Sequence, residues 1–291
     1  MTICIAAICE VGRLPTVLFC ADRLVSAGIQ FEVGTSKIIS ATPNSIIMES
    51  SGDTPFSEVI LDNFRNKIDQ KKGYKISELS SILSDTCKEQ REKTLDQNVV
   101  YRYNLAVSNL KGDANHILEN VINELRAFPY PDFEFIVCGL DNPSSPHIFT
   151  VDQDGNIKSW DFLGFAVIGS GGSMALSEMT KWRFTTMDQL PISITRIYFA
   201  KKAAERAIGV GRSTDYGVLS YKQISDSEAV PVMSNIDPDI IKELEAGHNE
   251  MMNTEGAVIT KTANKIIEVM LHIQSENEKA NAEKVKQNTT I

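Results

Sequence analysis

The pair of apolar runs at the start of the chain constrains the fold most. Residues from Thr2 to Cys9 are almost all apolar, and a second apolar run extends from Thr16 to Asp22. Gly12 and Pro15 lie between the runs and are typical of turns. A strand that is apolar at nearly every position needs cover on both of its faces. The two runs therefore predict a hairpin that is buried between other layers of structure.

The remainder of the chain shows blocks of strands separated by blocks of helices. Short apolar runs predict strands over residues 36–41, 45–50, 132–140, 148–151, 157–162, 165–168 and 217–223. Helical spacing predicts helices that begin at Thr54 and near Ser77, and others over residues 117–125, 173–184 and 192–207. Thr54 is expected to cap its helix, with Pro55 in the first turn. This order indicates an α+β fold in stacked layers, because βαβ units would alternate strand and helix one at a time.

The composition of the chain changes after Ser225. Residues 226–291 contain 12 acidic and 6 basic groups, so they hold -6 of the total net charge of -9. Five apolar residues of this part alternate steps of four and three, as in a coiled-coil seam: Ile259, Ala263, Ile266, Met270 and Ile273. We expect a domain over residues 1–225 and an acidic helical extension over residues 226–291, with the last ~15 residues disordered. The seam either packs on its own domain or pairs with another chain.

Composition excludes several classes of protein. The chain has 291 residues, of which 42% are hydrophobic and 23% charged, as in ordinary folded proteins. The net charge of -9 and the absence of a Lys/Arg cluster argue against a nucleic-acid partner. No apolar stretch reaches the ~18 residues of a membrane span, and the start of the chain lacks the basic region of a signal peptide. We therefore expect a cytoplasmic protein with no membrane partner.

The cysteine and histidine residues do not suggest a cofactor. The cysteines lie without any CxxC pair at Cys4, Cys9, Cys20, Cys87 and Cys138, and four of the five are in apolar runs, which favours reduced core thiols. The four histidines lack the spacing of metal ligands. The glycine-rich segment 169–172 resembles a phosphate cradle but lacks the Lys-Ser/Thr ending of a P-loop. No cofactor and no metal are expected.

Thr2 is the first candidate for chemistry, because it directly follows Met1. A free N-terminal threonine combines a nucleophilic hydroxyl with an amine whose pKa of about 7.7 to 8.0 allows it to accept the proton. Asp22 ends the second apolar run and Lys37 begins the next strand, so this ion pair could lie beside Thr2 and keep the amine neutral. The alternative is an ordinary surface ion pair. Gly52, in a strand-to-helix turn, could expose backbone N–H groups to a substrate carbonyl or could simply form the turn.

The motifs together resemble a known family. In the order found in proteasome β-type subunits and their bacterial peptidase relatives, the chain contains Thr2-Ile3, Ala21-Asp22-Arg23, Ser26-Ala27-Gly28, Lys37-Ile38, Ser51-Gly52-Asp53, the strand Phe135 to Gly139 with its Asp152-Gly155 hairpin, and Ile168-Gly169-Ser170-Gly171-Gly172. The resemblance extends over residues 2–223. It implies the N-terminal nucleophile (Ntn) hydrolase fold, which is a four-layer αββα sandwich, here with a helical C-terminal extension. Members of this family usually assemble into rings.

The resemblance also implies roles for individual residues. Thr2 would be the nucleophile and, through its amine, the base, with Asp22 and Lys37 as its charge partners. Gly52 would donate to the oxyanion, or Ser51 if the alignment shifts by one residue. Ser170 would be a supporting hydroxyl near the amine.

One further element of the family's site is altered. Ser213 fills the serine position of the last catalytic loop, but Val210 stands where the family has an aspartate. Asp215 could supply that carboxylate from the other side, or the support could be missing.

The substrate pocket implied by the resemblance contains Ile39, Ser50 and Thr54, none of which is charged. An unpaired charge would lose its hydration in such a pocket, so we expect a preference for small or medium uncharged residues before the cleaved bond. A shift of one residue would bring in Glu49 or Ser51, and Glu49 would favour basic side chains.

The function predicted from the sequence is that of a threonine-dependent amide or peptide hydrolase. We expect it to form a proteasome-like homo-oligomeric ring that cleaves peptide or protein substrates. An unfoldase partner is not identified by the sequence. Two alternatives remain at this point. The chain could be a catalytically inactive structural subunit of the same fold, which the residue Val210 suggests, or a small-molecule Ntn amidase.

Overall fold

The computed structural model describes residues 2–26, 30–32, 36–103, 115–225 and 228–288. The chain forms two compact units, Met1–Ile236 and Asp237–Ile291. The first unit contains helices and two five-stranded antiparallel sheets. Strands are grouped in sheets and helices in pairs, so the predicted α+β class is confirmed.

The first sheet contains the predicted N-terminal hairpin. Its order is β10-β1-β2-β11-β12, with strands at Phe165–Ile168, Cys4–Val11, Leu14–Asp22, Thr214–Ser225 and Glu228–Asn235. β1 and β2 pair antiparallel from Cys4↔Ala21 to Val11↔Leu14. Gly12 adopts a φ of 69° in the turn, where a glycine carries no steric penalty. This pairing confirms the hairpin and brings the start of β1 beside the end of β2.

The second sheet has the order β5-β6-β7-β8-β9, with strands at Ile38–Thr42, Ser45–Ser51, Phe133–Leu140, Pro146–Asp152 and Ile157–Ser159. Every neighbouring pair is antiparallel. A separate two-stranded sheet consists of β3 (Leu24–Ser26) and β4 (Gln30–Glu32). The second sheet thus supplies the strand that follows Lys37.

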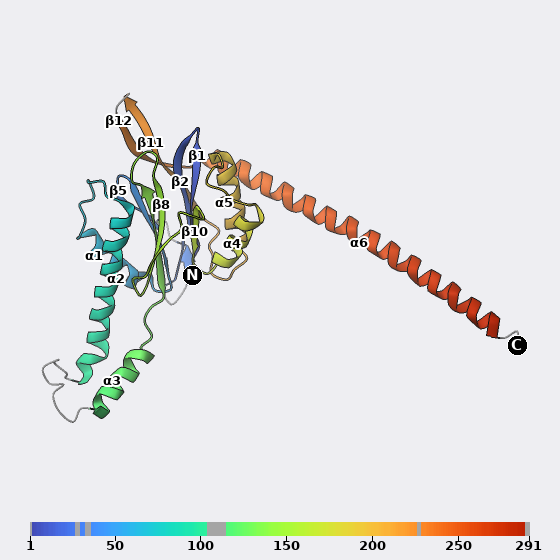
Figure 1. Ribbon diagram of the computed structural model, residues 1–291, viewed down its shortest axis with the longest axis horizontal. Helices are drawn as coiled ribbons and strands as arrows, with labels where there is room; N and C mark the ends of the chain where they lie inside the picture. Colours follow the sequence, from blue (N-terminus) through green and yellow to red (C-terminus); the bar gives the residue numbers. More distant parts are fainter. Residues whose placement is uncertain (1, 27–29, 33–35, 104–114, 226–227, 289–291) are drawn as a thin grey trace. The chain divides into compact units, whose positions relative to one another are not determined.

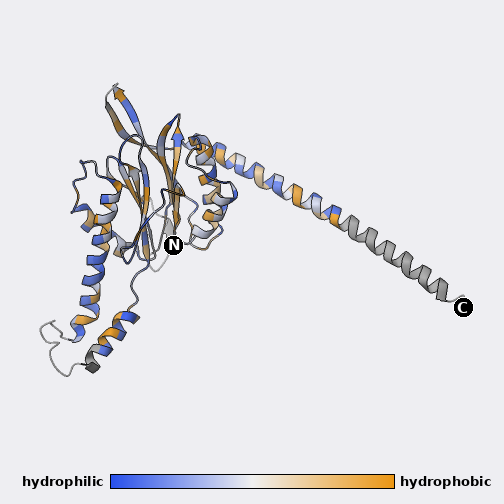
Figure 2. Ribbon diagram, viewed as in Figure 1, coloured by the Kyte–Doolittle hydropathy of each residue, from blue (hydrophilic) through white to orange (hydrophobic). Residues whose placement is uncertain are grey.

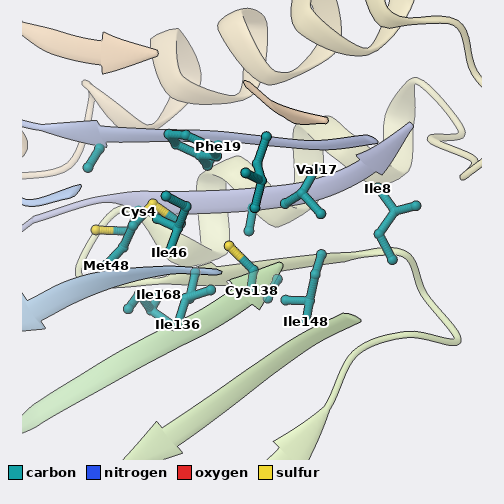
Figure 3. Close-up of a cluster of buried hydrophobic side chains, with 14 of the residues drawn as sticks. Cys4, Ile8, Val17, Phe19, Ile46, Met48, Ile136, Cys138, Ile148 and Ile168 are labelled. Carbon is teal, nitrogen blue, oxygen red and sulfur yellow. The ribbon is translucent and has the colours of Figure 1, made fainter. Parts of the chain in front are cut away.

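The two large sheets share a hydrophobic core. Cys4, Val17 and Phe19 from β1 and β2 face Met48 and Cys138 from β6 and β7, and all of them are buried. Figure 3 shows these side chains between the strands of the two sheets. Because β1 and β2 are covered by this core on one face and by helices on the other, their apolar runs are nearly continuous.

Helices cover the outer faces of both sheets. α1 (Thr54–Arg65) and α2 (Ile76–Asn98) pack on the second sheet through a core that includes Phe64, Leu79 and Phe135. α4 (Gly172–Lys181) and α5 (Leu190–Ala204) contact β10, β1 and β2 of the first sheet. The two helix pairs lie on opposite sides of the sheets in Figure 1. The short helix η1 (Val100–Tyr103) and α3 (Asn115–Ala127) follow α2.

The cap of α1 corrects one prediction. Asp53, and not Thr54, is the N-cap residue, since its carboxylate accepts a hydrogen bond of 3.3 Å from the N–H of Phe56. Thr54 is instead the first residue of the helix, followed by Pro55. Pro55 has no N–H to leave unpaired, so it fits the first turn as predicted.

The chain after Ser225 also differs from the expected extension. β12 pairs with β11 from Gly217↔Asn235 to Ser225↔Glu228, so residues 228–235 form a strand and the first unit continues to Ile236. α6 (Pro238–Asn288) then forms the second unit and mixes hydrophilic and hydrophobic residues along its coloured part (Figure 2). It remains helical over most of the segment that was expected to be disordered. Across the described residues, no helix combines the length and hydropathy that crossing a bilayer requires.

Candidate active site

Thr2, Asp22 and Lys37 meet at one end of the two sheets. The Thr2 hydroxyl donates to Oδ1 of Asp22 and accepts from Nζ of Lys37. The Lys37 ammonium lies 2.9 Å from the same Oδ1 of Asp22. Thr2 precedes β1, Asp22 ends β2, and Lys37 precedes β5 of the opposite sheet. The three residues singled out in the sequence are therefore in direct mutual contact.

Asp22 is completely buried and accepts several hydrogen bonds. Its Oδ1 receives the N–H of Ile3 at 3.2 Å, in addition to Thr2 and Lys37. Its Oδ2 receives the N–H of Gly211 at 2.6 Å. A buried carboxylate is stable as an anion only when such donors and a cation compensate its lost hydration. The surroundings of Asp22 thus hold a negative charge beside Thr2.

Lys37 uses the full donor capacity of its ammonium group. Besides Thr2 and Asp22, it donates to the backbone oxygen of Leu24. An ammonium has three N–H donors, so these contacts satisfy all of them. The Lys37 side chain is only 12% exposed. The geometry fixes a positive charge against the Thr2 hydroxyl oxygen.

Gly169 and Ser170 contact the backbone of Thr2. Gly169 has a φ of 100°, and a Cβ atom at this position would lie 2.1 Å from the carbonyl oxygen of Thr2. The Ser170 hydroxyl donates to the same oxygen at 3.5 Å, which is long and weak for a bond between two oxygens. The segment predicted to support Thr2 is therefore adjacent to it, through the Thr2 carbonyl.

The N–H of Gly52 is already engaged in the second sheet. It donates to the carbonyl oxygen of Asp132 at 3.0 Å, at the end of the pairing between β6 and β7. Successive N–H groups of an antiparallel strand point to opposite neighbours. The N–H of Ser51 therefore points away from β7, toward the edge where β5 and Lys37 lie. Of the two oxyanion donors that the sequence left open, the N–H of Gly52 is therefore engaged in the sheet, and the N–H of Ser51 is not turned toward β7.

A cleft of about 410 Å³ lies next to Gly169 and Ser170, the residues that contact the Thr2 carbonyl. It is lined by Ser50, Gly52, Asp132, Phe133, Glu134, Gly169 and Ser170. Burial raises the pKa of the Glu134 carboxyl. Part of its lining is one end of the second sheet, where Ser50 pairs with Glu134 across β6 and β7.

The cleft and the substrate pocket predicted from the sequence overlap only in part. Of the three pocket residues predicted from the sequence, Ser50 alone lines the cleft. Ile39 packs against the core under α1 and α2, and Thr54 is the first residue of α1. Ile39 pairs with Ile47 of β6, and alternate residues of a strand face opposite sides of the sheet, so Ile39 and Ser50 lie on different faces. Two acidic residues, Asp132 and Glu134, also line the cleft, where none was expected.

The last loop of the predicted site is arranged differently from the family pattern. Val210 lies against Gly171, where a Cβ atom would be 2.9 Å from its Cγ2. The Asp215 carboxylate is held by Arg23, at 3.0 Å from Nε and 2.5 Å from Nη2. Ser213 is exposed, and its carbonyl oxygen accepts the N–H of Arg23 at 3.0 Å. Asp215 is therefore committed to Arg23.

Gly211 is a site residue that the sequence analysis did not identify. Its N–H binds Asp22, and a Cβ atom here would lie 2.9 Å from Cβ of Leu24 and 3.1 Å from Oδ2 of Asp22. Only a glycine permits so close an approach. The signal in the sequence was the pair Gly209 and Gly211, which is equally typical of a helix end and its loop.

Comparisons with known proteins support a proteasome-like chain. Residues 88–193 match the family model described as Proteasome subunit. Among solved structures, the fold is similar to that of an Anbu (Gly-1) mutant from Hyphomicrobium sp. strain MC1, with 14% sequence identity, a TM-score of 0.58, and coverage of 88% of this chain and 97% of that chain. A search of curated proteins gives no significant match. The predicted resemblance is confirmed, whereas Thr2, Asp22 and Lys37 lie outside the residues that the family model matches.

Proposed function

We propose, from the premise that this chain is proteasome-like, that it is a threonine-dependent amide hydrolase that cleaves peptides with Thr2 as its nucleophile. One observation carries the proposal: the Thr2 hydroxyl is hydrogen-bonded to both Asp22 and Lys37. A positive charge next to the oxygen favours its deprotonated form. The buried Asp22 in turn stabilises the ammonium of Lys37, at 2.9 Å.

Cleavage of the bond between Met1 and Thr2 would release the amine that serves as the base. The amine accepts the hydroxyl proton while Oγ1 of Thr2 forms a bond to the substrate carbonyl carbon. The N–H of Ser51 would hold the negative oxygen of the tetrahedral intermediate. The C–N bond then breaks, and the leaving amine takes the proton from the ammonium of Thr2. Water hydrolyses the resulting ester with the same amine as base, which restores Thr2.

The order of layers supports the αββα sandwich of the Ntn type as the detailed fold. α1 and α2 contact the second sheet, α4 and α5 contact the first, and the sheets share one core. We extend the proposal to a cytoplasmic homo-oligomeric ring, on the strength of the family resemblance. Light scattering coupled to size exclusion should then give a mass several times that of one chain, and a monomer would contradict it.

A catalytically inactive structural subunit is the second candidate. Val210 stands where the family has an aspartate, and it contacts the glycine-rich segment at Gly171. Asp215 is bound to Arg23 and does not compensate. A subunit that lacks this support would keep the fold and the contacts among Thr2, Asp22 and Lys37, here called the Thr2 cluster. It would turn over substrate slowly or not at all.

One experiment separates the two candidates. Intact-mass measurement first establishes that Met1 is absent, and hydrolysis of fluorogenic peptides is then compared for the wild type, Thr2→Ala and the control Thr254→Ala on α6. We expect Thr2→Ala to abolish hydrolysis and the control to retain it. Undiminished turnover by Thr2→Ala would disprove the mechanism. No turnover by wild type without Met1 would favour the inactive subunit.

A further inference from the structure

A buried lysine outside the Thr2 cluster holds the loop that binds Asp22. Lys201 on α5 is only 1% exposed. Its ammonium donates to Oε1 of Glu205 at 2.5 Å and to the carbonyl oxygen of Arg212 at 2.7 Å. A lysine is almost never fully buried unless it is paired. The ammonium is therefore committed to its own helix at one contact and to the following loop at the other.

The contact to Arg212 leads directly to the catalytic cluster. Gly211, the preceding residue, donates its N–H to Oδ2 of Asp22 at 2.6 Å. The segment Gly211–Arg212 is thus held between a buried ammonium and a buried carboxylate. Asp22 Oδ1 bonds to Thr2 and Lys37, so the loop acts on the nucleophile through Asp22.

Gly211 packs closely against Leu24 and Asp22, so a shift of the Gly211–Arg212 segment would change these contacts. The α-carbon of Gly211 approaches Leu24 and Asp22 so closely that a Cβ atom would be 2.9 Å from Leu24 Cβ and 3.1 Å from Asp22 Oδ2. Without the ammonium, the Arg212 carbonyl and the Glu205 carboxylate lose a buried donor, and both gain by moving toward water. Such a shift would draw Gly211 away from Asp22.

We propose that Lys201 is a positioning residue for the Thr2 cluster, which anchors the Gly211–Arg212 segment so that the Gly211 N–H stays on Asp22. The charged groups around Lys201 are Lys202 on α5 and Glu205, the C-cap residue of that helix, and the neighbouring titratable group on β2 is Cys20. Burial lowers the pKa of the Lys201 ammonium, and Glu205 opposes that effect. The catalytic part of this inference rests on the proposed function, whereas the structural part does not.

Loss of the Gly211 donor has a predictable electrostatic consequence. The carboxylate of Asp22 would keep its charge with one hydrogen bond fewer, so the potential around Thr2 becomes more negative. A more negative potential favours the protonated form of the Thr2 amine, which raises the pKa of that amine. Because the amine must be neutral to act as base, the acidic limb of the rate profile should move to higher pH.

The test compares Lys201→Met with the control Lys202→Met. Lys202 is the next residue of α5 and pairs with the same carboxylate, that of Glu205, at 3.3 Å. Hydrogen exchange of the Gly211 amide is measured in both variants after far-UV circular dichroism confirms folding. We expect exchange to be roughly tenfold faster in Lys201→Met, as for the loss of one charge-assisted hydrogen bond. Exchange in Lys202→Met should equal that of the wild type.

The second readout is the pH dependence of kcat/KM. In Lys201→Met its acidic limb should move to higher pH with KM within about twofold of wild type, since substrate binding is not altered. Lys201→Arg, which keeps a cationic donor, should restore part of both readouts. If Lys201→Met does not fold, Lys201→Gln replaces it in the same comparison with Lys201→Arg.

The outcomes distinguish this inference from the proposed function. Gly211 exchange that is unchanged in Lys201→Met, or equally accelerated in Lys202→Met, overturns the anchoring role whether or not the chain hydrolyses peptides. Faster Gly211 exchange with an unchanged pH profile overturns the link to the nucleophile. If the wild type is inactive, only the proposed function is disproved. The exchange rate of the Gly211 amide then still decides whether Lys201 anchors the Gly211–Arg212 segment.

Discussion

Lys37 Nζ lies 2.9 Å from Oδ1 of Asp22, although Asp22 is in one sheet and Lys37 adjoins the other. Asp22 ends β2 of the first sheet, and Lys37 immediately precedes β5 of the second. Their contact exists only when the two sheets have packed on their common core. The Thr2 hydroxyl, which contacts both residues, therefore acquires its charged neighbours from the tertiary structure.

This relationship predicts that Thr2 and Lys37 act as one unit. Lys37→Ala should lower kcat nearly as much as Thr2→Ala, because without the ammonium the alkoxide loses its stabilising charge. The double variant should be no slower than either single variant, since groups that act together are not additive. Steady-state kinetics of the three variants tests this, and losses that multiply would indicate separate roles. Lys67→Ala, which removes only an ion pair with Glu89 on α2, is a control that should keep full activity.

Gly169→Ala should destabilise the chain strongly. The new Cβ would lie 2.1 Å from the Thr2 carbonyl oxygen, and the φ of 100° is unfavourable for alanine. We expect a loss of about 3 kcal/mol in the free energy of unfolding, measured by urea denaturation. Gly172→Ala is the matched control, because its Cβ would meet only Cγ1 of Val167 at 3.8 Å. It should change stability by at most about 1 kcal/mol. Equal stabilities of the two variants would refute the packing argument.

Glu49 predicts a pH-dependent stability. It is 6% exposed, accepts a hydrogen bond of 2.5 Å from Ser57, and burial raises its pKa from 4.5 to about 7. The folded chain therefore binds this proton more tightly than the unfolded chain, so the contribution to stability is present below pH 4.5 and is lost as the pH rises toward 7. Glu49→Gln should remove this decline and gain up to about 3 kcal/mol at pH 8.

The control for that experiment is Glu58→Gln on the exposed face of α1. Glu58 is half exposed and makes one ion pair, at 3.7 Å, with Arg65. Its substitution should shift the unfolding free energy by less than about 1 kcal/mol at every pH. The free energy of unfolding is measured from pH 4 to pH 8. If it falls in parallel for Glu49→Gln and the wild type, Glu49 is not the source of the pH dependence.

The acidic residues of the cleft predict a preference for basic substrates. Asp132 and Glu134 line the cleft, so a Lys or Arg side chain that enters it finds a partner, and an acidic side chain is repelled. In a fluorogenic panel, we expect basic peptides to be cleaved at least tenfold faster than acidic ones, a difference of about 1.4 kcal/mol. Glu134→Gln should reduce that ratio, and Asp62→Asn on α1 should leave it unchanged. Fastest cleavage of uncharged peptides would instead support the pocket predicted from the sequence.

The sequence predicted those features that depend on local pattern. The apolar runs of β1 and β2 indicated their hairpin, and the hairpin register alone brings Thr2 next to Asp22. The direction of the Ser51 and Gly52 N–H groups could not be predicted, because it depends on how β6 pairs with β7. A shift by one residue exchanges the two directions. The sequence pattern around Gly52 is the same in either case.

Residues that act through distant contacts were also missed. Lys201 looks like one of two adjacent surface lysines in the sequence, and only the packing of α5 shows that it is buried while Lys202 remains partly exposed. Glu134 lies in an otherwise apolar strand, and its place in the cleft follows from its pairing with Ser50. Neither property is present in the local spacing of apolar residues.

The five buried cysteines allow the order in which the layers of the fold separate to be measured on the unmodified chain. All are free and buried, and burial raises the pKa of Cys9, Cys20, Cys87 and Cys138 to about 12, so thiol reagents meet almost no thiolate in the folded state. Cys138 lies between the two sheets, whereas Cys87 lies between α2 and the second sheet. The order in which an alkylating reagent modifies these two thiols, read by peptide mass, therefore records which layer separates first, without any label added to the sequence.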